Sequence, residues 1–152
     1  MDLETFKTLF LRTINNKANP YHPLVWINGD PVIGSRTYIG GFSEINAKGA
    51  RVVIGHDCDI ASFVAINVAD SHRRCIELSD TNDCADIIIG DHVFIGSHSA
   101  VLVGAVIGHH SVVAAGTIVR AGVVPPFSLI TNDRVKPGYY QGQYQARGGS
   151  AH

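Results

Sequence analysis

One histidine of the chain stands in a setting that suits acid–base chemistry. His72 follows Asp70 by two residues and precedes Arg73 in the segment NVADSHRRCIE. An imidazole is mostly neutral at pH 7, so it can take a proton from a weak nucleophile such as a hydroxyl group. Asp70 can orient the imidazole or accept a hydrogen bond from the backbone of a turn, and the sequence leaves both roles open. Arg73 can meet an anionic group of a substrate or simply keep a loop soluble.

A repeat of six residues must position these groups. Aliphatic residues recur at this spacing, and a second series, mostly of small residues, sits four residues after each of them. The aliphatic positions are Ile27, Ile33, Ile39, Ile45, Ile54, Ile60, Ile66, Ile89, Ile95, Val101, Ile107, Val113 and Val119. Both series point to the same side of an extended strand, and a period of six fits neither a helix nor simple alternation. The repeat predicts an all-β solenoid with three short strands in each coil.

The repeat is interrupted twice and has a visible end. Three extra residues intrude at about 50–53, and a longer loop leaves one corner at about 71–86. Pro125 and Pro126 are expected to end the repeat, which gives a little over four coils. Strict counting places Asp70 and Val123 on the inward series.

The segments outside the repeat differ from it in composition. Residues 2–14 have apolar side chains near helical spacing and Asp2 as a possible cap, so we expect a helix that covers one end of the solenoid. Residues 137–152 are polar and rich in glycine, which predicts a flexible tail. The expected division is therefore 1–26 as helix and leader, 27–136 as solenoid, and 137–152 as tail.

Composition excludes several functions. The 152 residues are 45% hydrophobic and 16% charged, with a net charge of −1, so no basic field indicates binding to nucleic acid or to an anionic membrane. No apolar run reaches the ~18 residues of a membrane span. The N-terminal sequence lacks the pattern of a signal peptide. Three cysteines without zinc-type spacing are read as reduced thiols, which favours a cytoplasmic protein without a metal.

Three motifs, IIIGDHVFIGSH, AVIGHHSVVAAGTIV and VVPPFSLITNDRVK, resemble the hexapeptide-repeat acyltransferases, in particular the galactoside and maltose O-acetyltransferases and their relatives in surface-polysaccharide pathways. The likeness covers about 54–136. It implies a left-handed parallel β-helix, a homotrimer with active sites between neighbouring subunits, and acetyl-CoA as the donor. The function that it implies is an acetyl-CoA-dependent O-acetyltransferase that modifies a sugar hydroxyl in surface-polysaccharide biosynthesis.

The resemblance also assigns roles to residues. His72 takes the place of the catalytic base at the start of the loop, and the main-chain N–H of Ser97 that of a donor to the thioester carbonyl. The coenzyme A contacts that it implies fall on Phe94, Ser97, Ala115, Arg120 and Lys136. Phe94 stands where the family often has tryptophan, and TNDRVK replaces the family's usual AGNPAK.

The acceptor and the exact reaction are less well determined. Glu44 and Asn46 can contact a sugar in a cleft, with Arg73, or they are ordinary solvated corner residues. The resemblance implies a sugar or a nucleotide-sugar as the acceptor, and the alternative function is an N-acetyltransferase for an amino-nucleotide-sugar. A zinc γ-carbonic anhydrase-like site on the same fold needs a second histidine five residues after His98, where the chain has Val103. A trimeric scaffold without catalysis is the fourth alternative.

Overall fold

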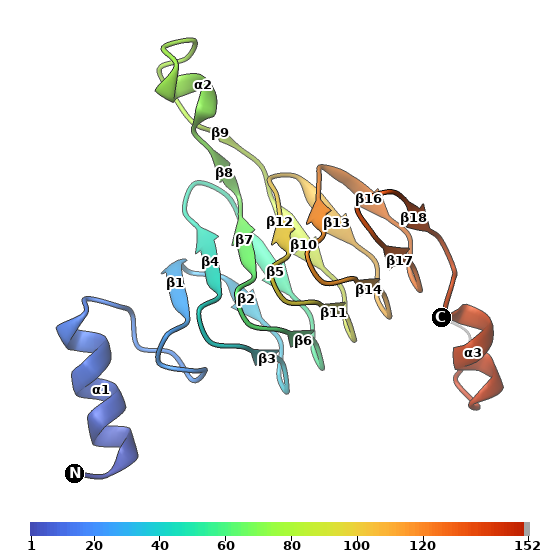
Figure 1. Ribbon diagram of the computed structural model, residues 1–152, viewed down its shortest axis with the longest axis horizontal. Helices are drawn as coiled ribbons and strands as arrows, with labels where there is room; N and C mark the ends of the chain where they lie inside the picture. Colours follow the sequence, from blue (N-terminus) through green and yellow to red (C-terminus); the bar gives the residue numbers. More distant parts are fainter. Residues whose placement is uncertain (151–152) are drawn as a thin grey trace.

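A computed structural model of the protein describes residues 1–150 and shows a β-solenoid whose coil passes through three parallel sheets in turn (Figure 1). Sheet A contains β1 (Trp26–Gly29), β4 (Glu44–Ala47), β7 (Ala65–Asn67), β12 (Ala100–Val101) and β15 (Ile118–Val119). Sheet B contains β2 (Val32–Ile33), β5 (Val52–Ile54), β10 (Ile87–Ile89), β13 (Ala105–Ile107) and β16 (Gly122–Val124). Sheet C contains β3 (Tyr38–Ile39), β6 (Asp59–Ile60), β11 (Phe94–Ile95), β14 (Val112–Val113), β17 (Leu129–Ile130) and the antiparallel β18 (Val135–Lys136). The predicted all-β solenoid of hexapeptide repeats is confirmed.

The interior of the coil is filled by the aliphatic series of the repeat. Ile45 pairs in register with Ile27 on one side and Ile66 on the other, and Ile54 and Ile89 pair in the same way in sheet B. Nearly every member of the series is less than 10% exposed, the exception being Ile33 on the first coil. Each such side chain contributes about 1.5–3 kcal/mol through burial, so the stacked columns hold the corners in fixed positions.

At two of the three corners, residues other than glycine adopt the left-handed backbone region. Eight non-glycine residues there have φ between 54° and 65°: Arg36, Asp57, His92, His110 and Phe127 between sheets B and C, and Phe42, Phe63 and His98 between sheets C and A. Since the coils are in register, these side chains stack above one another. The rings of Phe42 and Phe63 lie 5.0 Å apart and those of Phe63 and His98 4.9 Å apart.

The end of the repeat differs from the prediction. Strand β16 comes directly before Pro125, and the chain passes Pro125 and Pro126 as a corner into β17. Each sheet therefore has five parallel strands, more than the predicted coil count. The corner before β16 is one residue shorter than the corner before β13, since Gly122 pairs with Ala105. This shortening reverses the alternation: Val124 is 8% exposed and Val123 is 78% exposed. The inward position predicted for Val123 is therefore wrong.

The predicted N-terminal helix is confirmed as α1 (Leu3–Thr13), and Asp2 caps it by accepting a hydrogen bond from the Thr5 N–H at 2.8 Å. Its packing differs from the prediction, because Leu11 is the buried residue of α1 whereas Leu3 and Phe6 are 74% and 53% exposed. Figure 1 shows α1 standing beside the first coil. No helix within residues 1–150 combines the length and the hydropathy of a membrane span.

The C-terminal segment contains a helix that the sequence analysis did not predict. Helix α3 (Gln141–Ala146) lies against the last coil through Tyr144, whose ring centroid is 5.2 Å from that of Phe127 and 4.7 Å from that of His110. The last two residues of the expected tail, 151 and 152, lie outside the described part of the chain.

Candidate active site

The loop that carries His72 leaves the coil after β7, at the corner between sheets A and B. Its two arms, β8 (Ala69–Asp70) and β9 (Asp83–Cys84), pair as an antiparallel ribbon, and α2 (His72–Cys75) lies at the far end. Figure 1 shows this ribbon projecting well beyond the coil. The Arg51 guanidinium contacts the Asp86 carboxylate at 2.7 Å at the base of the loop, and the Arg51 N–H donates to the same carboxylate at 2.8 Å. The predicted loop is therefore an ordered, projecting ribbon, and the contacts between Arg51 and Asp86 hold its base in place. We call this segment the arm.

His72 and Asp70 form a hydrogen-bonded pair on this arm. The Nδ1 of His72 lies 2.7 Å from the Oδ1 of Asp70, and the backbone N–H of His72 donates to the same oxygen at 3.0 Å. Asp70 thus fills both roles that the sequence left open. Its predicted inward position is wrong, because the chain leaves the coil at Val68, which is fully buried, and the Asp70 side chain is 43% exposed.

The pair fixes the protonation pattern of the imidazole. Hydrogen bonds from the His72 backbone N–H and then from the His72 ring hold the pKa of Asp70 below its ordinary value, so the carboxylate is ionised at neutral pH. An ionised carboxylate only accepts hydrogen bonds, so in the neutral imidazole Nδ1 carries the proton and Nε2 has the lone pair. His72 is 63% exposed, and its Nε2 can therefore act as a base toward a molecule that approaches the arm.

The arginines after His72 are engaged within the arm. The Arg73 guanidinium lies 3.6 Å from the Asp83 carboxylate of β9, and the Arg74 Nε donates to the Asn82 side chain at 2.7 Å. Since both side chains have partners inside the loop, the structure favours a role for Arg73 in holding the arm.

Ser97 and Ala115 lie together on another corner, between sheets C and A. The Gly116 N–H donates to the Ser97 carbonyl at 2.8 Å, and a Cβ on Gly96 would lie 2.4 Å from the Ala115 nitrogen. Gly96 is therefore required for the two turns to approach this closely. Phe94 lies next to this corner on the outside of sheet C and is 40% exposed.

One chain does not bring these two groups of residues to a common corner. The arm with His72 starts between sheets A and B, whereas the turn with Ser97 joins sheets C and A. A site that uses the His72 base and the Ser97 backbone needs two copies of the chain.

The last coil carries a cationic cavity at the corner between sheets A and B. Arg120 and Arg134 both line this cavity of about 320 Å³, together with Asn132 and one carboxylate, Asp133, so two positive charges face one negative charge. The Asn132 side chain accepts from the Ile118 N–H and donates to the Gly116 carbonyl, both at 2.8 Å, so it covers the exposed edge of β15. Lys136 lies elsewhere, on β18, with its Nζ 5.2 Å from the centre of the Tyr139 ring. The sequence analysis missed Arg134 as a candidate, although its charge and its place in TNDRVK were visible.

The two acceptor candidates, Glu44 and Asn46, lie on the outer surface of sheet A. Both belong to β4 and alternate with the buried Ile45, so they are strand residues and not the corner residues that the sequence analysis considered. Glu44 accepts a hydrogen bond from the Asn28 amide at 3.2 Å, and the Asn46 amide donates to Asn67 at 3.0 Å.

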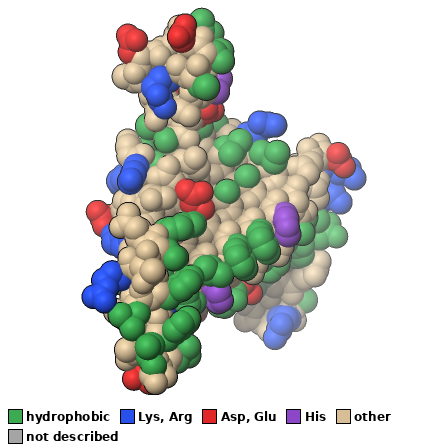
Figure 2. Space-filling model, turned by 60° about the vertical axis from the view of Figure 1, so that its left-hand side comes forward, with side chains coloured by type: hydrophobic (Ala, Val, Ile, Leu, Met, Phe, Trp, Pro, Cys, Tyr) green, Lys and Arg blue, Asp and Glu red, His purple; other side chains and the backbone are tan. Residues whose placement is uncertain are grey.

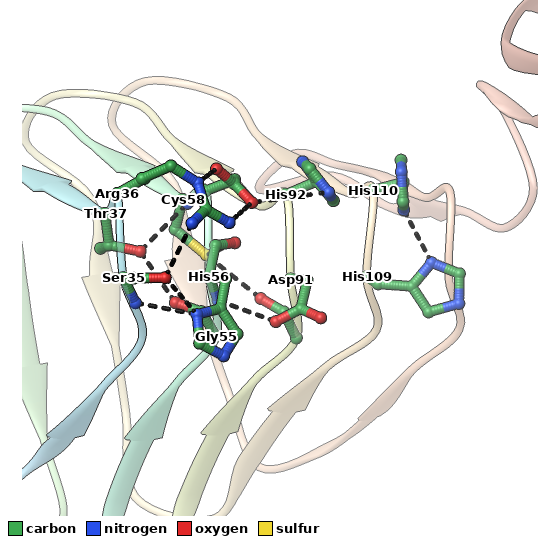
Figure 3. Close-up of polar contacts among 12 residues, drawn as sticks. Ser35, Arg36, Thr37, Gly55, His56, Cys58, Asp91, His92, His109 and His110 are labelled. Carbon is green, nitrogen blue, oxygen red and sulfur yellow. Dashed lines mark hydrogen bonds and ion pairs between the residues drawn. The ribbon is translucent and has the colours of Figure 1, made fainter. Parts of the chain in front are cut away.

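Most other histidines stabilise the corner between sheets B and C (Figure 3). His56 accepts the Ser35 N–H at 2.8 Å, His92 lies 3.9 Å from the Asp57 carboxylate, and the Nδ1 atoms of His109 and His110 are 2.9 Å apart. Within residues 1–150 no three side chains of the metal-binding types come together as a metal site.

The fold and the repeat define a class, the hexapeptide-repeat β-solenoids. The family profile described as the hexapeptide repeat of succinyl-transferase matches residues 86–121. The galactoside O-acetyltransferase of Escherichia coli (strain K12) is 29% identical over 85% of this chain and 68% of its own length.

Solved structures agree with this class. The crystal structure of a polysialic-acid-specific acetyltransferase matches 74% of this chain and 59% of its own chain, with 29% identity and a TM-score of 0.59. The acetyl-CoA complex of a hexapeptide-repeat acetyltransferase from Vibrio cholerae O1 biovar eltor shares the fold, with 22% identity, a TM-score of 0.53 and coverage of 87% and 83%. The resemblance to hexapeptide-repeat acyltransferases is thus shown by repeat and fold. The chain spans 24% of the length of a polysialic acid O-acetyltransferase of Escherichia coli O1:K1 and 68% of that of the galactoside O-acetyltransferase.

Proposed function

We propose that the protein is an acetyl-CoA-dependent O-acetyltransferase that modifies a sugar hydroxyl. The observation that carries the proposal is the pair of His72 and Asp70 on a projecting arm, with 2.7 Å between the ring nitrogen and the carboxylate. The names of the galactoside and polysialic acid relatives support a sugar acceptor, and a role in surface-polysaccharide biosynthesis belongs to the same proposal.

The geometry supports transfer in one addition–elimination reaction. The Nε2 of His72 takes the hydroxyl proton while the oxygen forms a bond to the thioester carbonyl carbon. The negative charge that develops on the carbonyl oxygen is stabilised by the Ser97 N–H of a neighbouring copy, and one such donor is worth about 3 kcal/mol. When the C–S bond breaks, the leaving thiolate takes the proton from the His72 imidazolium, and the ionised Asp70 stabilises that cation in between.

The proposal includes the homotrimer that the resemblance implies. Neighbouring copies in it can combine the base and the carbonyl donor, which lie on different corners of one chain. An aliphatic row on the outside of sheet B supports such packing. The row consists of Val32, Val53, Ile88, Val106 and Val123, paired in register from strand to strand. Val32 and Val123 are 64% and 78% exposed in the single chain, which is unfavourable in water and is relieved when a second copy covers them.

Acetyl-CoA fits the same arrangement as a co-substrate. Arg120 and Arg134 line the cavity at the last coil and can pair with the phosphates of its nucleotide part. The turn of Ser97 and Ala115 offers backbone groups to the pantetheine arm, and Phe94 an apolar surface beside it.

The test is thioester cleavage with acetyl-CoA and a series of sugars, comparing the wild type with His72→Ala. Removing a positioned base should lower kcat by about 10²–10⁴-fold. His92→Ala is the matched control, since His92 is a half-exposed histidine at the opposite corner, and it should retain activity. Unchanged turnover in His72→Ala would contradict hydroxyl chemistry and would favour an amine acceptor, which can arrive unprotonated and needs a base less.

A further inference from the structure

The three outer faces of the solenoid carry different side chains, although their inner faces are alike. Sheet B presents the aliphatic row. Sheet C presents a mixed series of Tyr38, Asp59, Phe94, Val112 and Leu129. Sheet A is the face whose first three strands present amides, a carboxylate and an indole: Trp26, Asn28, Glu44, Asn46 and Asn67. The polar composition of sheet A needs its own explanation, because outward side chains are not part of the buried core that stabilises the coil.

Three asparagines form a row across sheet A. Asn28 pairs in register with Asn46, and Asn46 pairs with Asn67. Their side chains are partly tied to their neighbours: Asn67 accepts from the Asn46 amide at 3.0 Å and from the Ala69 N–H at 3.0 Å. Each amide offers two donor hydrogens and two acceptor lone pairs, so the row retains capacity for a ligand with many hydroxyl groups. We call these three residues the amide row.

The amide row leads directly to the base. Asn67 ends β7, and the chain leaves the coil at Val68 and continues into β8 and the pair of Asp70 and His72. Neighbouring strands lie about 4.8 Å apart, so Asn46 and Asn28 extend the row from this point in two even steps.

The other long edge of sheet A is aromatic. Trp26 is 42% exposed and pairs in register with Glu44, and the stacked rings of Phe42, Phe63 and His98 follow the corner beside it. Figure 2 shows a band of hydrophobic side chains crossing the molecule below a broad, mostly uncharged area, with the arm above. A surface with apolar rings at one side and planar hydrogen-bonding groups beside them matches the two kinds of surface that a sugar ring presents.

The charges around this face do not favour an anion. Glu44 lies within it and Asp70 at its end. Two nearby cations have acidic partners, since Arg51 contacts Asp86 and Arg73 lies 3.6 Å from Asp83. Lys48, whose backbone N–H donates to Asn46, is the nearby cation that has no ion pair within residues 1–150, and it is outnumbered by Glu44 and Asp70. An acidic sugar would meet the Glu44 carboxylate without a clear excess of positive charge to offset it.

We propose that the outer face of sheet A binds the acceptor, and that this acceptor is a neutral saccharide lying across the amide row between Trp26 and His72. This inference rests on the proposed O-acetyltransferase function and adds the acceptor class and three residues, Trp26, Asn28 and Asn67, to it. Glu44 and Asn46 then act as acceptor-binding residues.

The chain itself supplies the probe for a test, because Trp26 is its single tryptophan. The full-length protein is titrated without acetyl-CoA, with maltose and lactose as neutral saccharides and with a sialic acid oligomer as the anionic one, while Trp26 fluorescence is recorded. A saturable change is expected with a neutral saccharide. Asn46→Ala should weaken this binding about tenfold, the loss of one or two hydrogen bonds, and Tyr38→Ala on sheet C should leave it unchanged.

The outcomes separate this inference from the proposed function. Saccharide binding that is weakened in Asn46→Ala supports the outer face of sheet A as the acceptor site. If the protein binds saccharide in this way but never cleaves acetyl-CoA, the proposed reaction is wrong and the inference about the binding face still holds. Absence of a saturable change with both neutral saccharides overturns the inference. Tighter binding of the sialic acid oligomer, weakened by Arg73→Ala and not by Asn46→Ala, also overturns it and places the acceptor on the arm.

Discussion

The outer faces of sheets A and B are built on the same coil and differ in nearly everything that they expose. Both cover the same interior, in which isoleucines and valines stack in register. Sheet A exposes an indole, amides and a carboxylate, whereas sheet B exposes five aliphatic side chains in one row. A six-residue repeat therefore fixes the inside of the protein and leaves the outside free, so that one face is available for a ligand and another for a second copy of the chain.

The largest effect is expected from a charge in the aliphatic row. Val106→Asp would place a carboxylate in the proposed contact between copies, where an unpaired charge is strongly unfavourable. We expect the protein to elute as a monomer in size-exclusion chromatography with light scattering. Acetyl transfer should be lost as well, because the proposed site uses residues of two copies. Ala100→Asp on sheet A is the matched control for assembly. A trimer that persists in Val106→Asp would show that sheet B is not the contact.

A second pair of variants compares the interior behind the two faces. Ile66 of β7 and Ile89 of β10 are each 1% exposed and pair with aliphatic residues on both sides. Truncation to alanine should lower the free energy of unfolding by about 2–5 kcal/mol in each case. Urea unfolding measures both values. If one variant loses several kcal/mol and the other almost nothing, the interior behind sheets A and B is not uniform. The different outer faces could then not be described as built on one common interior.

A smaller effect is expected from Asp70→Asn. The amide can no longer hold the proton on Nδ1 in the same way or stabilise the imidazolium, so kcat should fall roughly tenfold to hundredfold, less than in His72→Ala. The KM for acetyl-CoA should stay close to that of the wild type. Asp83→Asn serves as the control, since it removes a carboxylate from the same arm without touching His72, and equal losses in both variants would argue for a purely structural role of Asp70.

The sequence was sufficient to predict the coil, because the buried aliphatic series from Ile27 to Val119 follows a period that no other common element has. It was not sufficient where one residue changes the phase: the shorter corner before Gly122 turns Val123 outward, and the exit of the chain at Val68 does the same for Asp70. Both shifts depend on contacts between coils that spacing alone does not reveal. The exposed stripe of α1 and the docking of Tyr144 were missed for the same reason.

The candidate site was predictable in part. The arm and its histidine were visible as an interruption of the repeat, and the structure adds the carboxylate contact and the separation of His72 from Ser97. The amide row could have been found by writing the three hexads of each coil beneath one another, since Asn28, Asn46 and Asn67 then share a column. Arg134 was overlooked because it follows a turn whose path depends on Asn132.

The parallel register has a consequence for how such a protein can change. Since each coil adds one rung of about 4.8 Å to every face, duplication of a single coil would lengthen the surface of sheet A by one position while the arm and its base stay as they are. The number of coils before the arm thus sets the length of the sheet A surface. Adding or removing a coil would change how long a ligand this surface can accommodate.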